Sequence, residues 1–259
     1  MQITLTLNGA TLTEDVRADM TLFDFCRAHG YKSVKCACET SNCGLCTVLL
    51  DGEPVLSCSV LMARVDGREV TTLEGMRDGR RELLAQCLAE EGAEQCGFCA
   101  PGLEMAVLAL DAAHADADDE TVRRYLSGNL CRCSGYASQM RAIRRFLARH
   151  ANGGELPPRE VPADPTTESG ESHAQITRPV AKKDSGALLA GAPVYTADLA
   201  PEGALVVKLV RSRYANARVL DVDKSRALGM IDEIREAMRA YAAEKGADGI
   251  VLCITDIME

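Results

Sequence analysis

Residues 34–58 read VKCACETSNCGLCTVLLDGEPVLSC, and the spacing of the cysteines in this stretch decides how the front of the chain is interpreted. Cys38, Cys43 and Cys46 follow a C-x4-C-x2-C pattern, and Cys58 lies across an expected hairpin. This spacing is typical of four thiolates around a 2Fe–2S cluster. Structural zinc usually takes two separated pairs of ligands, each with a short internal gap, and it fits the pattern poorly. The stretch therefore predicts an iron–sulfur site.

A second set of cysteines lies further along the chain. Cys96 and Cys99 form a C-x2-C pair in EQCGFCAPG, and Cys131 and Cys133 form a C-x-C pair in GNLCRCSGY. A single residue between two thiols strains the tetrahedral geometry that zinc requires. We therefore expect these four residues to hold a second cluster.

Both motifs carry a resemblance to a known family. Q-C-G-F-C-x-P-G followed by G-N-L-C-R-C-S-G-Y is similar to the second cluster motif in the iron–sulfur subunit of the xanthine dehydrogenase and aldehyde oxidase family. The first motif resembles the ferredoxin-like domain of the same family. The resemblance implies that electrons leave a molybdopterin centre on a large subunit, pass a proximal cluster at the second motif and a distal cluster at the first, and reach FAD or another acceptor. It also implies that Gln95 contacts the pterin, the alternative being a polar loop residue.

The first motif departs from the family pattern at three positions. The family usually has glycine where this chain has Ala37, and a Glu-Gly pair where it has Thr40-Ser41. We expect the added Cβ atoms to affect the potential of the distal cluster more than its ligation. Cys36 is expected not to be a ligand, because only Cys38 gives the four-residue gap.

Composition limits the class of partner. A net charge of −9 argues against nucleic acid or an anionic membrane, and no apolar stretch approaches the ~20 residues that span a bilayer. Twelve cysteines without a secretion signal indicate ligation in a reducing compartment, so we expect a cytoplasmic protein. The other thiols in apolar patterns are interpreted as buried core residues, namely Cys26, Cys87 and Cys253.

Periodicity predicts two domains at the front of the chain. In residues 1–75, apolar and polar residues alternate on both sides of Asn8-Gly9 and predict a hairpin. Residues 21–29 predict a helix. Further strands are expected at residues 48–50, 55–58 and 70–72. In residues 76–151 the period is helical, with four helices expected near residues 83–91, 101–114, 119–128 and 137–150. The arginines of the last helix are expected to form a solvated face, and they are Arg141, Arg144, Arg145 and Arg149.

Three further segments follow. Residues 152–175 are rich in Pro, Gly, Glu, Ser and Thr and predict a linker. Residues 176–230 resemble the start of the family's molybdenum subunit, with Tyr195 and Asp198 in its Tyr-x-x-Asp turn. Residues 231–259 predict a helix and a strand, and they resemble a fragment of the C-terminal domain of manganese-dependent inorganic pyrophosphatases.

We therefore expect an α+β chain in which a β-grasp ferredoxin-like domain precedes an all-α four-helix domain, a linker and a partial α/β segment. The expected function is electron transfer within a molybdenum hydroxylase, with FAD on a partner chain or a missing domain. This chain alone is not expected to turn over a substrate, because nearly all of the molybdenum domain is absent. The alternative is a stand-alone ferredoxin-like carrier, or a zinc-binding module without a redox role.

Overall fold

The computed structural model describes residues 1–151, 182–192 and 195–199, together with isolated positions at 213–216, 218, 220, 221, 236 and 240. The chain divides into two units, Met1–Glu202 and Gly203–Glu259, and the contacts described below all belong to the first. The linker predicted at 152–175 and Cys253 lie outside the described residues, as does the tail at 231–259 apart from two positions.

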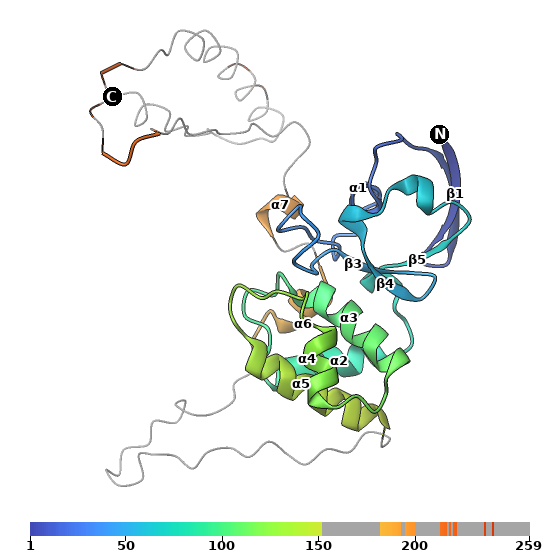
Figure 1. Ribbon diagram of the computed structural model, residues 1–259, viewed down its shortest axis with the longest axis vertical. Helices are drawn as coiled ribbons and strands as arrows, with labels where there is room; N and C mark the ends of the chain where they lie inside the picture. The colour runs from blue at the N-terminus through green and yellow to red at the C-terminus, as the bar shows by residue number, and fades with distance from the viewer. Residues whose placement is uncertain are drawn as a thin grey trace. The chain divides into compact units, whose positions relative to one another are not determined.

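The first domain is a mixed five-stranded sheet with one helix packed against it (Figure 1). Its strands are β1 (Gln2–Leu7), β2 (Ala10–Asp15), β3 (Thr47–Leu50), β4 (Glu53–Leu56) and β5 (Glu69–Thr71). The strand order is β2-β1-β5-β3-β4, and only the β1–β5 pair is parallel. The predicted first hairpin is confirmed, because Asn8 and Gly9 both adopt positive φ, as a two-residue hairpin turn requires.

Helix α1 (Leu22–Ala28) covers the sheet with an apolar face. The Thr21 side chain caps its first turn by accepting a hydrogen bond from the Asp24 backbone N–H at 3.1 Å. Leu22, Phe25 and Cys26 are fully buried, so the predicted helix and its buried thiol are confirmed.

The strand predicted at 55–58 is wrong at its end. Strand β4 stops at Leu56, and Ser57–Ser59 form a 3-10 turn, η1. The Ser57 side chain donates to the Cys46 carbonyl oxygen at 2.7 Å, and its backbone N–H donates to the same oxygen at 3.2 Å. These bonds hold Cys58 on a turn beside Cys46 and not on a strand.

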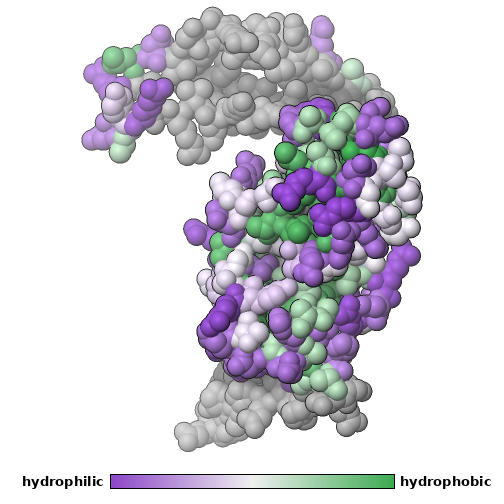
Figure 2. Space-filling model, turned by 45° about the vertical axis from the view of Figure 1, so that its right-hand side comes forward, coloured by the Kyte–Doolittle hydropathy of each residue, from purple (hydrophilic) through white to green (hydrophobic). Residues whose placement is uncertain are grey.

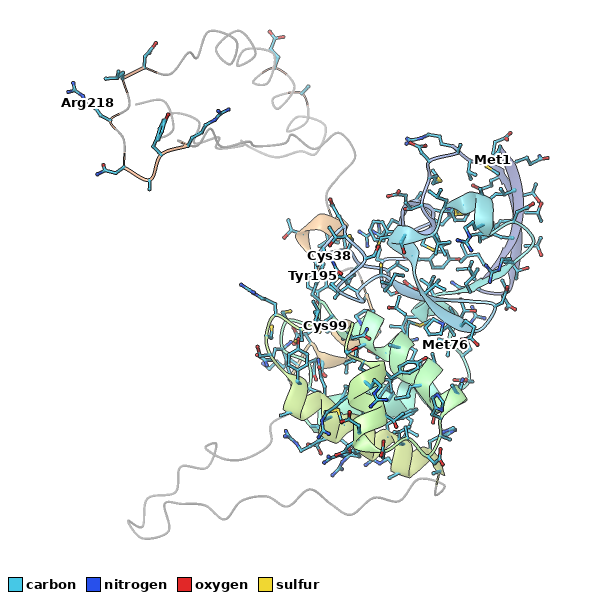
Figure 3. All side chains as sticks on the ribbon, in the orientation of Figure 1. Met1, Cys38, Met76, Cys99, Tyr195 and Arg218 are labelled. Atoms are coloured by element: carbon cyan, nitrogen blue, oxygen red, sulfur yellow. The ribbon has the colours of Figure 1, made fainter. Side chains whose placement is uncertain are left out.

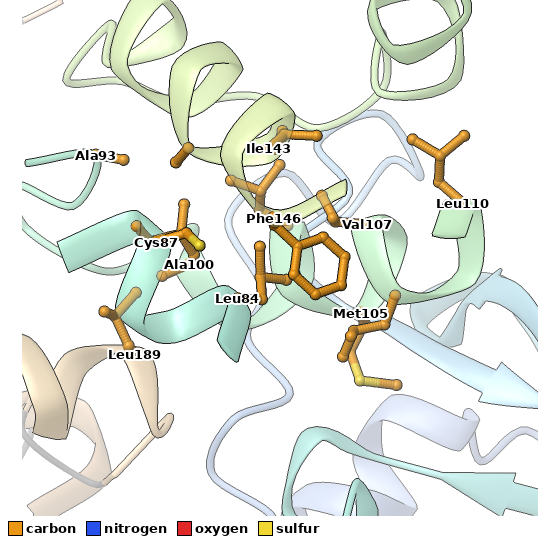
Figure 4. Packing of buried hydrophobic residues seen from close by; sticks show 14 of the residues in the cluster. Leu84, Cys87, Ala93, Ala100, Met105, Val107, Leu110, Ile143, Phe146 and Leu189 are labelled. Atoms are coloured by element: carbon orange, nitrogen blue, oxygen red, sulfur yellow. The ribbon is translucent and has the colours of Figure 1, made fainter. Parts of the chain in front are cut away.

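The second domain is a bundle whose core is drawn in Figure 4. Its helices are α2 (Arg80–Glu90), α3 (Ala100–Ala113), α4 (Asp119–Tyr125) and α5 (Tyr136–Ala151). Leu84, Val107, Ile143 and Phe146 meet in this core from three of the helices. The four predicted helices are therefore present, although α4 ends three residues before the predicted stop at Gly128.

The expectation of a solvated arginine face on α5 is wrong for two of its residues. The side chains of Arg145 and Arg149 are only 14% and 13% exposed. Arg145 pairs with Glu90 at 3.2 Å and with Glu91 at 3.1 Å, and Arg149 pairs with Glu90 at 2.9 Å. The acidic end of α2 lies opposite these arginines, which sequence periodicity within α5 could not show.

The two domains meet through main-chain atoms. The Leu130 backbone N–H donates to the Cys43 carbonyl oxygen at 2.9 Å. The Asn129 side-chain amide lies 3.4 Å from the Gly44 carbonyl oxygen and 3.3 Å from that of Gly102. A Cβ at Gly102 would lie 2.4 Å from the same Gly44 oxygen, so the two backbones are in direct contact there.

Residues 182–192 and 195–199, here called the strap, lie against both domains. They contain α6 (Ser185–Leu189) and α7 (Thr196–Leu199). Ser185 donates to the Glu94 carboxylate of the second domain. A Cβ at Gly191 would lie 2.6 Å from Ser33 of the first domain and 3.5 Å from Pro101 of the second.

The surface of the described residues is largely hydrophilic on the face seen in Figure 2, with smaller apolar areas between the polar ones. Within the described parts of the chain, no helix has the length and apolar character needed to cross a membrane.

Candidate iron–sulfur centres

The predicted ligands of the first site come together as two pairs of free thiols. The Cys38 side chain interacts with that of Cys43, and the Cys46 side chain interacts with that of Cys58. Cys43 and Cys46 are buried, whereas Cys38 and Cys58 are half-buried.

The loop of the first site favours a thiolate at Cys38. Hydrogen bonds from the backbone N–H groups of Thr40 and Asn42 lower the pKa of Cys38 to about 6. Glu39 and Ser41 adopt left-handed φ values of 50° and 59°, and such residues turn successive N–H groups toward an anion. Thiolate is the form of cysteine that binds metal, so this backbone is arranged for ligation.

Burial has the opposite effect deeper in the site. It raises the pKa of Cys46 to about 12 and also raises that of Cys43. Uncompensated burial of an anionic sulfur is unfavourable, and bound iron would supply the missing positive charge.

Gly44 is required by the turn and by the neighbouring domain. Its φ of 74° is left-handed, and an added Cβ would lie 2.6 Å from the Asn129 amide nitrogen and 2.7 Å from the Gly128 carbonyl oxygen. The C-G-x-C spacing around Gly44 also predicts a residue without a side chain, because the backbone there must pass close to a cluster. The structure adds the domain junction as a second reason.

The second site also contains two pairs of thiols. The Cys96 side chain interacts with that of Cys133, and the Cys99 side chain interacts with that of Cys131. Cys96 and Cys99 lie just before α3 and at its start. Cys131 and Cys133 lie in the loop before α5. Two helices therefore bring together four residues that are far apart in the sequence.

Backbone N–H groups stabilise a thiolate in this site too. Burial alone would raise the pKa of Cys131, but hydrogen bonds from the N–H groups of Gly135, Cys133 and Ser134 lower it. Ser134 has a φ of 59°, which matches the left-handed residues of the first loop. The Cys131 N–H itself donates to the Tyr136 hydroxyl at 2.8 Å.

Two polar side chains near the ligand sulfurs were not found by sequence reasoning. The Gln139 amide nitrogen lies 3.8 Å from the Cys99 sulfur, and Gln139 is 5% exposed. The Ser41 hydroxyl lies 3.7 Å from the Cys58 sulfur. Sequence carries little signal for either contact, because Gln139 belongs to the helix after the motif and Ser41 faces a residue across the hairpin.

Gln95 lies beside the second site. Its amide nitrogen donates to the Cys133 carbonyl oxygen at 3.2 Å, and the residue is exposed. The position leaves the side chain accessible to a partner molecule, and the predicted pterin contact stays a prediction.

The arrangement of the thiols tests whether the residues fit iron–sulfur clusters. Each iron of a 2Fe–2S cluster is held by two protein ligands, and each site offers two interacting pairs of thiols. Among the described residues, no three His, Cys, Asp or Glu side chains are grouped around a point suited to a single metal ion. The donor set fits a binuclear cluster in each domain.

Two protein families match successive parts of the chain. Residues 5–70 match the family described as 2Fe-2S iron-sulfur cluster binding domain, and residues 72–144 match the family described as [2Fe-2S] binding domain.

Curated relatives match in two ways. The chain is 41% identical over 152 residues to the nicotinate dehydrogenase small FeS subunit of Eubacterium barkeri, covering 58% of this chain and 97% of that protein. It is 42% identical over 137 residues to the xanthine dehydrogenase iron-sulfur-binding subunit of Escherichia coli O157:H7, covering 52% and 86%. The aldehyde oxidoreductase of Megalodesulfovibrio gigas is 32% identical over 238 residues, which are 89% of this chain and 26% of that one.

Solved structures likewise match either the front part of this chain or a longer stretch of it. The aldehyde oxidoreductase of Desulfovibrio desulfuricans aligns with a TM-score of 0.64 and 32% identity, covering 78% of this chain and 22% of that one. The quinoline 2-oxidoreductase structure from Pseudomonas putida aligns with a TM-score of 0.54 and 35% identity over 60% of this chain and 98% of that one. The expected α+β fold, a ferredoxin-like domain followed by a helical domain, is confirmed.

Proposed function

This chain belongs to the family of two-cluster iron–sulfur subunits and domains of molybdenum hydroxylases, and we propose that each of its sets of four thiols holds one 2Fe–2S cluster. The first set is Cys38, Cys43, Cys46 and Cys58, and the second is Cys96, Cys99, Cys131 and Cys133. The protein is an electron-transfer component of an oxidoreductase.

The observation that carries the ligand assignment is the pairing of thiols in both domains. When bound, such a cluster takes up and releases one electron. The residues of this chain supply the conditions for that chemistry. N–H groups around Cys38 and Cys131 favour thiolates, and the bond between Leu130 and Cys43 holds the two loops next to each other.

We place the second site on the side of a molybdopterin-binding large subunit and the first on the side of a FAD-binding subunit or another acceptor. Gln95 supports this order, because its exposed amide lies beside Cys133 and can reach a partner's cofactor. Relatives are named as small subunits of nicotinate dehydrogenase and nicotine 6-hydroxylase, which supports a multi-subunit assembly. A cytoplasmic location stays a prediction from cysteine usage.

The cluster content tests the proposal. Anaerobically purified protein should contain about four irons and four acid-labile sulfides per chain, and two paramagnetic signals should appear on reduction. Cys43→Ser and Cys99→Ser should each remove a different signal and about half of the iron. Colourless protein that contains zinc would instead support the zinc-binding alternative.

The partner assignment needs its own experiment. Gln95→Ala should leave both clusters intact but slow reduction of the second cluster by a substrate-reduced molybdenum subunit. Gln86→Ala, an exposed glutamine on α2, is the matched control and should leave the rate unchanged. Equal rates for both variants would remove Gln95 from the site, and failure to co-purify a molybdenum subunit would favour a stand-alone carrier.

A further inference from the structure

A buried lysine of the first domain points at the loop of the second site. The Lys35 side chain is 2% exposed, although lysine is rarely buried. Its ammonium lies 5.7 Å from the ring centroid of Phe98 and 4.7 Å from that of Tyr195. Phe98 stands between Cys96 and Cys99, so the cation of the first domain lies against the loop that carries these two cysteines.

The strap holds this arrangement in place. The Tyr195 hydroxyl donates to the Cys96 carbonyl oxygen at 2.6 Å, and its ring meets the Phe98 ring edge-on with centroids 5.1 Å apart. The position of Tyr195 beside the Cys99 loop can be followed in Figure 3. The hydroxyl of Tyr195 therefore contacts the main chain of one proposed ligand of the second site, and its ring packs against the residue between two of them.

Asp198 of the strap keeps the lysine where it is. Its carboxylate lies 3.5 Å from the Lys35 ammonium and 2.7 Å from the Arg27 guanidinium, and its side chain is 4% exposed. The Lys32 carbonyl oxygen accepts a further hydrogen bond from the ammonium at 2.8 Å. Burying a cation is unfavourable unless it is paired, and these partners hold the ammonium at this position.

We propose that the strap makes Lys35 an electrostatic partner of the second centre, and that its ammonium raises the reduction potential of the cluster held there. Reduction adds one electron, and so one negative charge, to a cluster that is already anionic. A nearby buried cation stabilises the added charge more than water-exposed cations do, because the local dielectric response is weaker. Lys35 belongs to the first domain but would adjust the reduction potential of the cluster in the second. The inference rests on the proposed ligation by Cys96, Cys99, Cys131 and Cys133.

The test is a reductive titration of the full chain, with each cluster followed by its own paramagnetic signal. Lys35→Met should lower the midpoint potential of the second cluster, and Lys35→Arg should keep it close to the parent value. Lys183→Met is the matched control, because it removes the charge of one lysine from an exposed position on the strap. Its smaller shift should disappear in high salt, whereas the shift from Lys35→Met should persist.

Several outcomes would overturn the inference. Equal shifts for Lys35→Met and Lys183→Met, or a fall in Lys35→Arg as large as in Lys35→Met, would show that the charge has no special position. If Lys35→Met fails to fold, Lys35→Gln retains a donor for the Lys32 carbonyl and should show the same fall. Iron content separates the two hypotheses, because a parent protein without the second cluster contradicts the proposed function itself.

Discussion

The two cluster sites differ in how far along the chain their ligands are gathered. The proposed ligands of the first all come from residues 38–58, on one loop and one turn. The proposed ligands of the second come from the start of α3 and from the loop before α5, so helix packing must bring them together. The first site is therefore a property of local backbone conformation, whereas the second is a property of the bundle.

The two sites should therefore be sensitive to different kinds of mutation. The first site should respond to the identity and conformation of individual loop residues. The second should respond to the stability of the helical core, even when the change lies far from sulfur.

Replacing one cysteine of the first loop tests its spacing rule. Cys38→Ala should lose the first cluster and about half of the iron, because only Cys38 has both the four-residue gap to Cys43 and the surrounding N–H groups. Cys36→Ala is the matched control and should retain all of the iron. Retention in Cys38→Ala together with loss in Cys36→Ala would reverse the ligand assignment.

Adding one methyl group at the domain junction tests whether the first loop depends on the second domain. Gly44→Ala should lower the free energy of unfolding by about 3 kcal/mol. The backbone at this position is left-handed, and the new Cβ would lie too close to a neighbouring carbonyl oxygen. Gly52 has a similar φ of 83° but no atom near the place of a Cβ, so Gly52→Ala should lower the free energy of unfolding by only about 1 kcal/mol. Chemical denaturation measures both. Equal losses would mean that the junction tolerates the extra atom.

A carboxylate in the helical core should make the second domain sensitive to pH. Glu104 is 0% exposed and neither carboxylate oxygen has a hydrogen-bond partner. Burial raises the pKa of Glu104 well above its usual range, against a weaker opposing effect of Arg81. As pH rises past the unfolded value, the unfolded chain loses this proton while the folded chain still holds it. Stability therefore decreases with rising pH until the folded pKa is reached.

Removing that carboxylate should abolish the decrease. Glu104→Met should raise the free energy of unfolding by about 1–3 kcal/mol at neutral pH and flatten its pH dependence above pH ~4.5. Chemical denaturation at a series of pH values is the measurement, and Glu120→Met, at an exposed position on α4, is the control. An unchanged pH profile in Glu104→Met would contradict the assignment.

The smallest expected effect concerns the polar side chains beside sulfur. Ser41→Ala should lower the midpoint potential of the first cluster alone by about 40 mV, the equivalent of one modest hydrogen bond in a one-electron couple. Gln139→Leu should do the same for the second cluster. A shift of both potentials in either variant would show that the two sites are less independent than their construction suggests.

Sequence reasoning worked best where structure is local. The Asn8-Gly9 hairpin, the helix capped by Thr21 and the helices of the bundle all follow from turn chemistry and periodicity. The cysteine motifs led to thiols that the structure brings together in pairs. The expected effect of Ala37 and Thr40-Ser41 on the potential of the first cluster stays a prediction, and of these three residues Ser41 adopts a left-handed φ.

What could not be predicted depends on contacts between distant segments. The burial of Arg145 results from the acidic end of α2, and the burial of Lys35 results from a segment more than a hundred residues away. Cys58 lies on a turn because Ser57 hydrogen-bonds the Cys46 carbonyl. The resemblance of residues 231–259 to a pyrophosphatase fragment stays a prediction.

The main-chain junction between Cys43 and Leu130 has a consequence for how such a protein can diversify. Peptide groups are the same in every residue, so the spacing they impose between the two centres is independent of most side chains. Tunnelling rates fall steeply with distance, and a spacing set by peptide groups protects the rate from mutational drift. Provided that Gly44 and Gly102 are retained, surface residues can change to suit new partners while the distance between the two centres stays the same.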